Sequence, residues 1–110
     1  MRIYISGMIT DDESHLEKFL HYDELLHRLV PDCETVNPAW MGLWLPESFS
    51  HSDFMEIDLV ALKKCDACFF INDWKNSIGC VQERAVCKQH RIKIIDEDNL
   101  ANELFRIFEN

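Results

Sequence analysis

The chain has 110 residues, of which 47% are hydrophobic and 11% aromatic, so it can form one packed domain but not two. Acidic residues outnumber basic ones by 20 to 11, and the resulting net charge of −9 disfavours binding to a nucleic-acid polymer. No apolar stretch approaches the roughly 18 residues of a membrane span, and the N-terminus lacks signal-peptide features. We therefore expect one domain over residues 1–110 and no membrane partner.

The first third of the chain predicts a strand, a helix and a second strand. Residues 2–6 are rich in β-forming side chains, and Gly7 then permits a tight exit from the strand. Apolar residues recur at three- and four-residue spacing over 14–30, which predicts an amphipathic helix that ends at Pro31. Ser14, with Glu17 three positions later, gives the start of this helix a capping-box pattern. Residues 33–36 predict the second strand.

The next segment, 39–52, follows Asn37-Pro38 and shows no clear hydrophobic period. It contains two tryptophans, a phenylalanine, a glycine and a proline. We interpret it as a long aromatic loop with at most one helical turn. Long ordered loops often carry function. The alternative is that the aromatic side chains simply cover one end of the core.

The rest of the chain alternates helices with strands. We expect helices over 53–64, 78–90 and 99–108, and strands over 67–71 and 92–95. Strands that alternate with helices pair in parallel through right-handed crossovers. The sequence therefore predicts an α/β three-layer sandwich with a parallel sheet of four to five strands.

The cysteines and histidines indicate no metal site. Five cysteines, an odd number, in a chain without an export signal favour reduced thiols in a cytoplasm. Cys65 and Cys68 lie between a helix and the following strand, which is the reverse of a thioredoxin-like redox pair. A structural zinc site would need a second close pair. His15, His21 and His27 recur every six residues and are interpreted as surface histidines.

Ligands of open α/β sheets bind beyond the carboxyl ends of the strands. Three segments meet there in the predicted sheet, namely Ser6-Gly7, Asn37-Pro38 and the stretch from Asp73 to Glu83. In the last of these, Glu83 lies one helical turn after Gly79, whose bare face would let a ligand reach the backbone. Ser77 precedes the helix at the end that favours anions. The alternative is an ordinary solvent-exposed glutamate, and Asp58 has the same alternative on its own helix.

Several short motifs in this order and spacing resemble the nucleoside 2-deoxyribosyltransferase superfamily, in particular its small branch in bacteria and phages. The similarity covers about residues 2–95. The matching residues are Arg2-Ile3-Tyr4-Ile5-Ser6-Gly7, Asn37-Pro38-Ala39, Asp58, Cys65-Asp66-Ala67, and Trp74, Ser77, Gly79 and Glu83.

The resemblance implies a flavodoxin-like fold and cleavage of the N-glycosidic bond of a deoxyribonucleoside or its 5′-monophosphate. Glu83 matches the family's nucleophile, Tyr4 the tyrosine that holds it, and Asp58 the carboxylate that helps protonate the leaving base. Ser77 matches a serine of the monophosphate hydrolases, where the nucleoside transferases have an aspartate. The expected substrate-binding residues are Ser6, Gly7, Asn37, Pro38, Asp73, Ser77 and Gly79.

The resemblance also implies a homo-oligomer, because members of the superfamily complete their sites with residues of a neighbouring subunit. Neither a cofactor nor a metal ion is expected, and the partner is a nucleotide or nucleoside. Two alternatives stay open. One is a catalytically silent nucleotide-binding module of the same fold, and the other is an interaction protein that uses the aromatic segment.

Overall fold

A computed structural model of the chain describes residues 1–9, 12–100 and 102. Its centre is a parallel sheet of four strands in the order β2-β1-β3-β4. The strands are β1 (Arg2–Ser6), β2 (Glu34–Val36), β3 (Ala67–Phe70) and β4 (Lys93–Asp96). The helices are α1 (His15–Leu29), α2 (Met41–Trp44), α3 (His51–Leu62) and α4 (Ile78–His90), with 3-10 turns η1 (Pro38–Trp40), η2 (Asn72–Asn76) and η3 (Glu97–Asn99).

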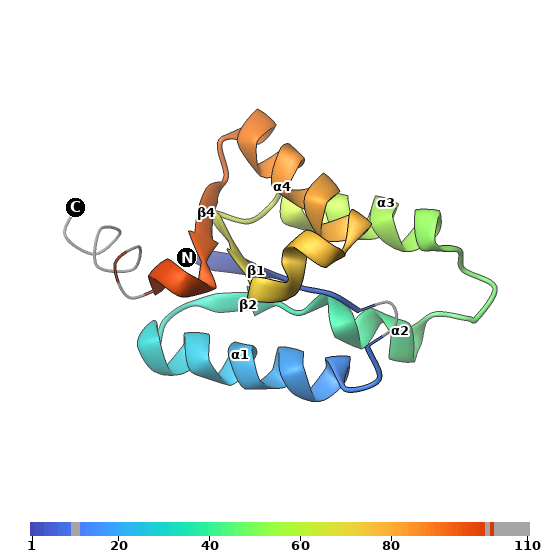
Figure 1. Cartoon of the computed structure of the whole chain (residues 1–110), viewed down its shortest axis with the longest axis horizontal. Coiled ribbons are helices and arrows are strands. Elements are labelled where there is room, and N and C mark those ends of the chain that lie inside the picture. Colours follow the sequence, from blue (N-terminus) through green and yellow to red (C-terminus); the bar gives the residue numbers. More distant parts are fainter. Residues whose placement is uncertain (10–11, 101, 103–110) are drawn as a thin grey trace.

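The elements form three layers. Figure 1 shows α1 along one face of the sheet, with α3 and α4 together on the opposite face. The strand order matches the flavodoxin-like arrangement, in which the order reverses between β1 and β3. The α/β three-layer sandwich expected from the sequence is therefore confirmed.

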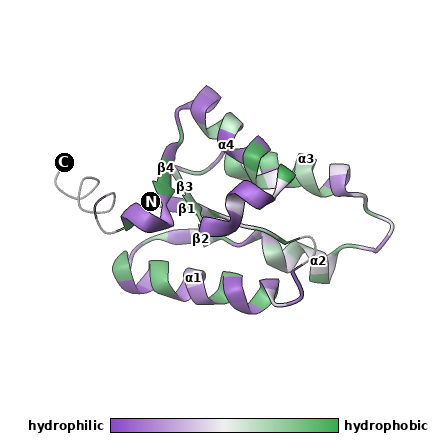
Figure 2. Cartoon of the chain, viewed as in Figure 1, coloured by the Kyte–Doolittle hydropathy of each residue, from purple (hydrophilic) through white to green (hydrophobic). Residues whose placement is uncertain are grey.

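Two apolar cores lie on the two faces of this sheet. The α1-side core includes Ile3, Ile5, Phe19, Leu26 and Phe69, whereas the α3/α4-side core includes Tyr4, Leu62, Cys68, Phe70 and Cys87. Successive strand residues point to opposite faces, so each buried strand contributes to both cores. Figure 2 shows hydrophobic and hydrophilic residues alternating along α1, because one side of this helix packs on the sheet.

The start of α1 differs from the prediction. Ser14 is the residue before the helix, but its side chain makes no capping hydrogen bond and instead donates to Asp12 Oδ1 at 3.0 Å. The expected capping box with Glu17 is therefore wrong. A complete capping box forms at α3, where Ser50 and Asp53 exchange hydrogen bonds of 3.1 and 2.8 Å. This box starts α3 at His51, two residues before the predicted start.

The other boundaries agree closely with the sequence. Helix α4 spans the predicted residues, β2 and β3 differ from the predicted strands by one residue at one end, and β4 is shifted by one residue. The aromatic segment contains η1 and the single turn α2 before α3 begins. The helix predicted over 99–108 lies mostly outside the described residues. Within the described ranges, no helix has the length and apolar character needed to cross a membrane.

Candidate active site

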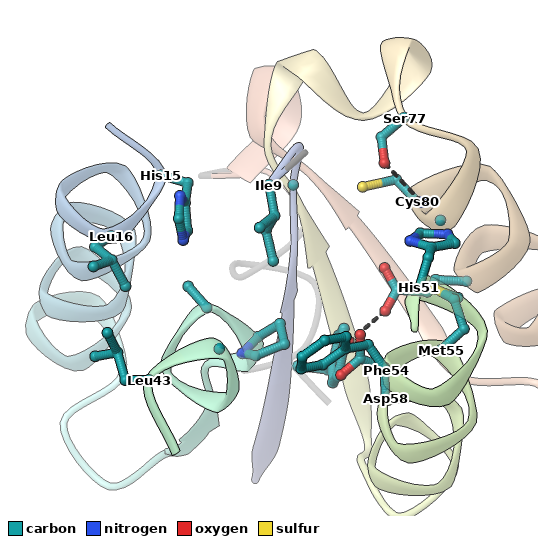
Figure 3. Close-up of a pocket in the computed structure, with 17 residues that line it drawn as sticks. Ile9, His15, Leu16, Leu43, His51, Phe54, Met55, Asp58, Ser77 and Cys80 are labelled. Carbon is teal, nitrogen blue, oxygen red and sulfur yellow. Dashed lines mark hydrogen bonds between the residues drawn. The ribbon is translucent and has the colours of Figure 1, made fainter. Parts of the chain in front are cut away.

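A cavity of about 450 Å³ opens beyond the carboxyl ends of β1 and β3. This is the place where the strand order reverses, and ligands of doubly wound sheets bind at such points. Its volume lies within the range of small-molecule sites, roughly 300–1,000 Å³. Figure 3 shows His15, Leu16 and Leu43 on one wall, with His51, Met55, Asp58 and Cys80 on the opposite wall.

Glu83 is a buried carboxylate at this cavity, and its side chain is fixed by two hydroxyl groups. The residue is 5% exposed, although it lies on a helix. Its Oε2 accepts a hydrogen bond from the Tyr4 hydroxyl, and its Oε1 accepts one from Ser6 Oγ at 2.8 Å. Burial raises the pKa of Glu83 to about 7, while the two hydrogen bonds act in the opposite direction. The alternative of a solvent-exposed glutamate is therefore wrong.

Asp58 is the second carboxylate of the cavity, and its environment differs from that of Glu83. It lies on α3 and is 9% exposed, so the solvent-facing alternative is wrong here as well. Its Oδ1 is the one buried side-chain oxygen or nitrogen in residues 1–9, 12–100 and 102 that has no hydrogen-bond partner. Burial, and then the charge of Glu83, raise the pKa of Asp58 to about 7. Unpaired polar atoms are rarely buried unless a ligand or ordered water completes them.

Tyr4 and Ser6 reach Glu83 because they lie two residues apart on β1. Residues at this spacing share a face of the sheet, and here that face is the one covered by α3 and α4. Tyr4 is fully buried, and its pKa is raised by burial, then by the charges of Glu83 and Asp58. The neutral hydroxyl is thus a hydrogen-bond donor at neutral pH.

Ser77 and Gly79 form the rim of the cavity at the start of α4. Ser77 caps this helix, and its Oγ accepts a hydrogen bond from Cys80 N at 3.2 Å. Gly79 lines the cavity, as expected, and its bare face also lies against Met55 of α3. A Cβ at Gly79 would lie 3.1 Å from Met55 Sδ, a tight contact that a small shift of the flexible thioether would relieve.

Gly7 and Pro38 also line the cavity. A Cβ at Gly7 would lie 2.6 Å from Ile71 Cδ1 and 3.2 Å from Phe19 Cζ, which no side chain tolerates without movement. Gly7 is therefore explained by core packing rather than by close approach of a ligand. Pro38 is buried and begins η1, the turn that leads the chain from β2 across the mouth of the sheet.

Asn37 and Asp73 do not line the cavity, although both were expected at the site. Asn37 Oδ1 accepts a hydrogen bond from Ala39 N at 3.2 Å, which caps η1. Asp73 accepts hydrogen bonds from Met8 N at 3.0 Å and from Lys18 Nζ at 2.6 Å. These residues position the loops after β2 and β1, and contribute to the site only through the backbone that they fix.

The structure adds pocket residues that the sequence analysis missed. His15, interpreted as a surface histidine, lines the cavity together with His51, Phe54 and Met55. The sequence signal that could have identified the α3 residues of the cavity is the spacing along this helix. Its capping box fixes the helix start, and from there His51, Phe54, Met55 and Asp58 share one helical face by their spacing of three, four and seven residues.

The cavity contains no obvious metal centre. Among the described residues, no group of three or more His, Cys, Asp or Glu side chains is arranged to hold a metal ion. All five cysteines are buried and free. Cys80 lines the cavity, but burial raises its pKa to about 11, so its thiol is protonated at neutral pH. The side chains of this cavity that can exchange a proton or attack as a nucleophile near neutral pH include the carboxylates of Asp58 and Glu83.

Comparison with known proteins identifies one family. The profile described as "Domain of unknown function (DUF4406)" matches residues 1–96, which include every strand and every residue of the cavity. Neither the curated proteins nor the solved structures gave a match. The description assigns no activity, so the function must be argued from the cavity. With more than four-fifths of its length matched by this profile, the chain belongs to the DUF4406 family.

Proposed function

We propose that this protein cleaves or transfers the N-glycosidic bond of a deoxyribonucleoside 5′-monophosphate, with Glu83 as the nucleophile. One observation carries the proposal. Two carboxylates are buried at the same cavity, and only one of them is held by hydrogen-bond donors. Paired carboxylates, one ionised and one protonated, are the groups that glycoside hydrolysis requires. The sequence resemblance to the nucleoside 2-deoxyribosyltransferase superfamily supports the same chemistry.

The environments of the two carboxylates support a proton on Asp58. Glu83 accepts hydrogen bonds from two hydroxyls, and such donors favour the charged form. Asp58 Oδ1 accepts none, and the charge of Glu83 further disfavours a second charge beside it. Near neutral pH, Glu83 is therefore the carboxylate that attacks the anomeric carbon, and Asp58 is the acid that protonates the leaving base.

The two roles give a balanced reaction. Attack by Glu83 forms an ester to the sugar and breaks the glycosidic bond, and the base leaves with the Asp58 proton. Asp58 is then ionised and acts as a base in the second step, in which an acceptor displaces Glu83 from the sugar. A water acceptor makes the enzyme a hydrolase, and a second base makes it a transferase.

The start of α4 supports a phosphate on the substrate. Ser77 caps the helix, where the first amides have no intrahelical acceptors and the helix dipole favours an anion. An aspartate at this position would repel phosphate. We therefore expect Ser77→Asp to weaken binding of a deoxynucleoside monophosphate much more than binding of the free nucleoside. Equal losses for both ligands would contradict a phosphate at Ser77.

We also propose a homo-oligomer, in a reducing compartment such as the cytoplasm. The free and buried cysteines are consistent with such a compartment.

The oligomer is supported by exposed apolar residues on η1 and α2, where Trp40 is 49%, Leu43 67% and Trp44 79% exposed. Apolar patches of this kind mark interfaces. Sedimentation should show at least a dimer at micromolar concentration, and a monomer of 13.0 kDa would contradict the proposal.

Release of free base is the experiment that tests the function. The purified protein is incubated with the four common deoxynucleoside 5′-monophosphates and the matching nucleosides, and free base is separated by chromatography. Base released from at least one monophosphate is the expected result. Binding without release would favour the silent nucleotide-binding module. If no nucleotide binds, the exposed patch on η1 and α2 favours an interaction protein.

A further inference from the structure

His51 is a basic side chain beside the start of α4, and the proposed reaction gives it no role. It is the first residue of α3 and lines the same cavity as Ser77 and Gly79. A Cβ at Gly79 would lie 3.8 Å from His51 Cε1 and 3.8 Å from Ser77 Oγ. Because Cε1 is the carbon between the two ring nitrogens, both nitrogens lie close to the first turn of α4. Figure 3 shows the His51 ring beside Cys80 and near Ser77.

Several hydrogen-bond donors therefore converge on one point of the rim. Ser77 Oγ accepts a hydrogen bond from Cys80 N and also contacts the Cys80 side chain, and its hydroxyl proton can rotate toward a ligand. The amides of Ile78 and Gly79, the first two of α4, have no acceptor within the helix. The imidazole N–H of His51 adds a third kind of donor. A tetrahedral oxyanion is the ligand chemistry that such a set of donors fits.

The charge around the cavity makes His51 more important for an anion. The chain has a net charge of −9, and two buried carboxylates line the cavity. Among the cavity-lining residues that the structure describes, only His15 and His51 are basic. The Nδ1 of His15 lies 2.9 Å from Asp12 O, on the opposite wall of the cavity. Because a carbonyl oxygen can only accept, this nitrogen is already used as a donor.

Two nearby cations are also engaged elsewhere. Lys18 Nζ contacts Asp12 and Asp73, and also donates to Met8 O at 2.7 Å. The Arg84 guanidinium pairs with Asp96 at 2.7 and 3.1 Å. Independently of the helix terminus, the unpartnered Asp58 Oδ1 leaves the cavity with a buried polar atom that a bound ligand would satisfy.

We propose that His51 donates a hydrogen bond to the 5′-phosphate and sets the preference of the site for nucleoside monophosphates over nucleosides. The inference rests on the proposed function for its substrate class, but it does not require that the bond is cleaved. His51 is thus a specificity-determining residue on α3, and it acts together with Ser77 and the first turn of α4.

Calorimetric binding in a Glu83→Gln background tests this inference without interference from turnover. The probes are the four common deoxynucleoside 5′-monophosphates and their nucleosides, and the measured quantity is the ratio of the two affinities for each base. His51→Gln should lower this ratio by about tenfold or more, as expected when one hydrogen bond to a charged group is weakened. His51→Lys supplies another hydrogen-bond donor at this position and should recover most of the preference. His90→Gln, at the far end of α4, is the matched control and should leave the ratio unchanged.

Either of two other outcomes would overturn the inference. The parent protein could bind nucleoside and monophosphate equally well, or His51→Gln could weaken both ligands by the same factor. Thermal melting of each variant shows whether it is folded, and His51 is exposed enough for substitution to be tolerated. Base release by the wild-type protein is scored separately. If base is released but the affinity ratio does not depend on His51, the proposed function stands and this inference fails. If the ratio depends on His51 but no base is released, this inference stands and the proposed function fails.

Discussion

The two faces of the sheet use the same strands for different purposes. Toward α1, β1 presents Ile3 and Ile5, which pack in an entirely apolar core. Toward α3 and α4, the same strand presents Tyr4 and Ser6, whose hydroxyls hold the buried Glu83. The strand neighbour β3 is fully buried and contributes to both cores. A single strand thus supports a stabilising face and a face that carries ionisable groups.

The α3/α4 side of the sheet carries an energetic cost that the α1 side does not. Burying a carboxylate away from water is unfavourable, and the shifted pKa values of Asp58 and Glu83 express that cost. Sites of this kind are tolerated when the remaining structure is stable enough. We therefore expect substitutions on the α1 side to change stability, and substitutions of the polar groups on the α3/α4 side to change activity.

Glu83→Gln gives the largest expected effect. The substitution keeps the size and most hydrogen bonding of the side chain but removes the attacking charge. Base release should fall by a factor on the order of 10³ or more, about 4 kcal/mol in activation free energy, while nucleotide binding survives. The rate of base release from a monophosphate is the measurement. Glu56→Gln, at an exposed position on α3, is the matched control. A folded Glu83→Gln protein with the wild-type rate would refute the mechanism.

Leu26→Ala should affect the other face, and stability rather than chemistry. Leu26 is fully buried in the α1-side core, so the truncation leaves a cavity and lowers the free energy of unfolding by about 3 kcal/mol. Leu29, on the same helix, is 46% exposed, and Leu29→Ala should cost well under half as much. Urea denaturation compares the two variants. Equal losses would show that the α1 side is not the stabilising face.

Tyr4→Phe separates positioning from packing on the α3/α4 side. It removes only the hydroxyl that donates to Glu83 and keeps the buried ring. We expect base release to fall about 10- to 100-fold, because a hydrogen bond to a charged group contributes about 1.5–3 kcal/mol. The pKa of Glu83 should also rise, since one donor that favours the carboxylate is lost. The pH dependence of base release measures this shift, and a purely structural role would leave the profile in place.

Asp58→Asn should change stability in a way that depends on pH. The folded pKa of Asp58 is raised to about 7, well above the unfolded value of about 3.9. The protonated carboxyl therefore contributes stability that is fully present below the unfolded pKa and is lost as pH rises through the folded value. Relative to wild type, Asp58→Asn should gain stability as pH rises from 4 to 7 and level off above that. Because one pKa unit corresponds to about 1.36 kcal/mol, the difference between pKa values of about 3.9 and about 7 gives a pH-dependent gain of up to about 4 kcal/mol between pH 4 and pH 8.

Denaturation of both proteins at pH 4, 6 and 8 checks this prediction. A difference in unfolding free energy that is independent of pH would show that Asp58 does not titrate in the expected range. The same variant should lose base release at every pH, because asparagine cannot donate the proton to the leaving base. Loss of activity combined with a gain in stability would be the clearest sign that the α3/α4 side serves function at the expense of stability.

The sequence determined the order and the boundaries of most elements. The apolar spacing over 14–30 and the doubly buried run over 67–71 are local signals, and both correspond to described elements. Ser77 also follows from local chemistry, because a hydroxyl residue before an amphipathic run favours a helix start. The failed cap at Ser14 shows the limit of such signals. Ser14 has φ −99° and ψ 17° instead of the extended backbone typical of an N-cap, and its hydroxyl donates to Asp12 Oδ1 without accepting a capping hydrogen bond.

The tertiary structure decided which polar residues make the site. Glu83 is buried only because Tyr4 and Ser6, more than 75 residues earlier, present hydroxyls to the same face. Asp73 and Asn37 occur at the expected strand ends, but their side chains are used by Lys18 and by the η1 turn. His51 lines the cavity from the start of α3, beside Gly79 of α4. Sequence spacing determines which residues share a helix face. Contacts between distant parts of the chain determine which element covers that face, and therefore how buried and how charged the surroundings of its residues are.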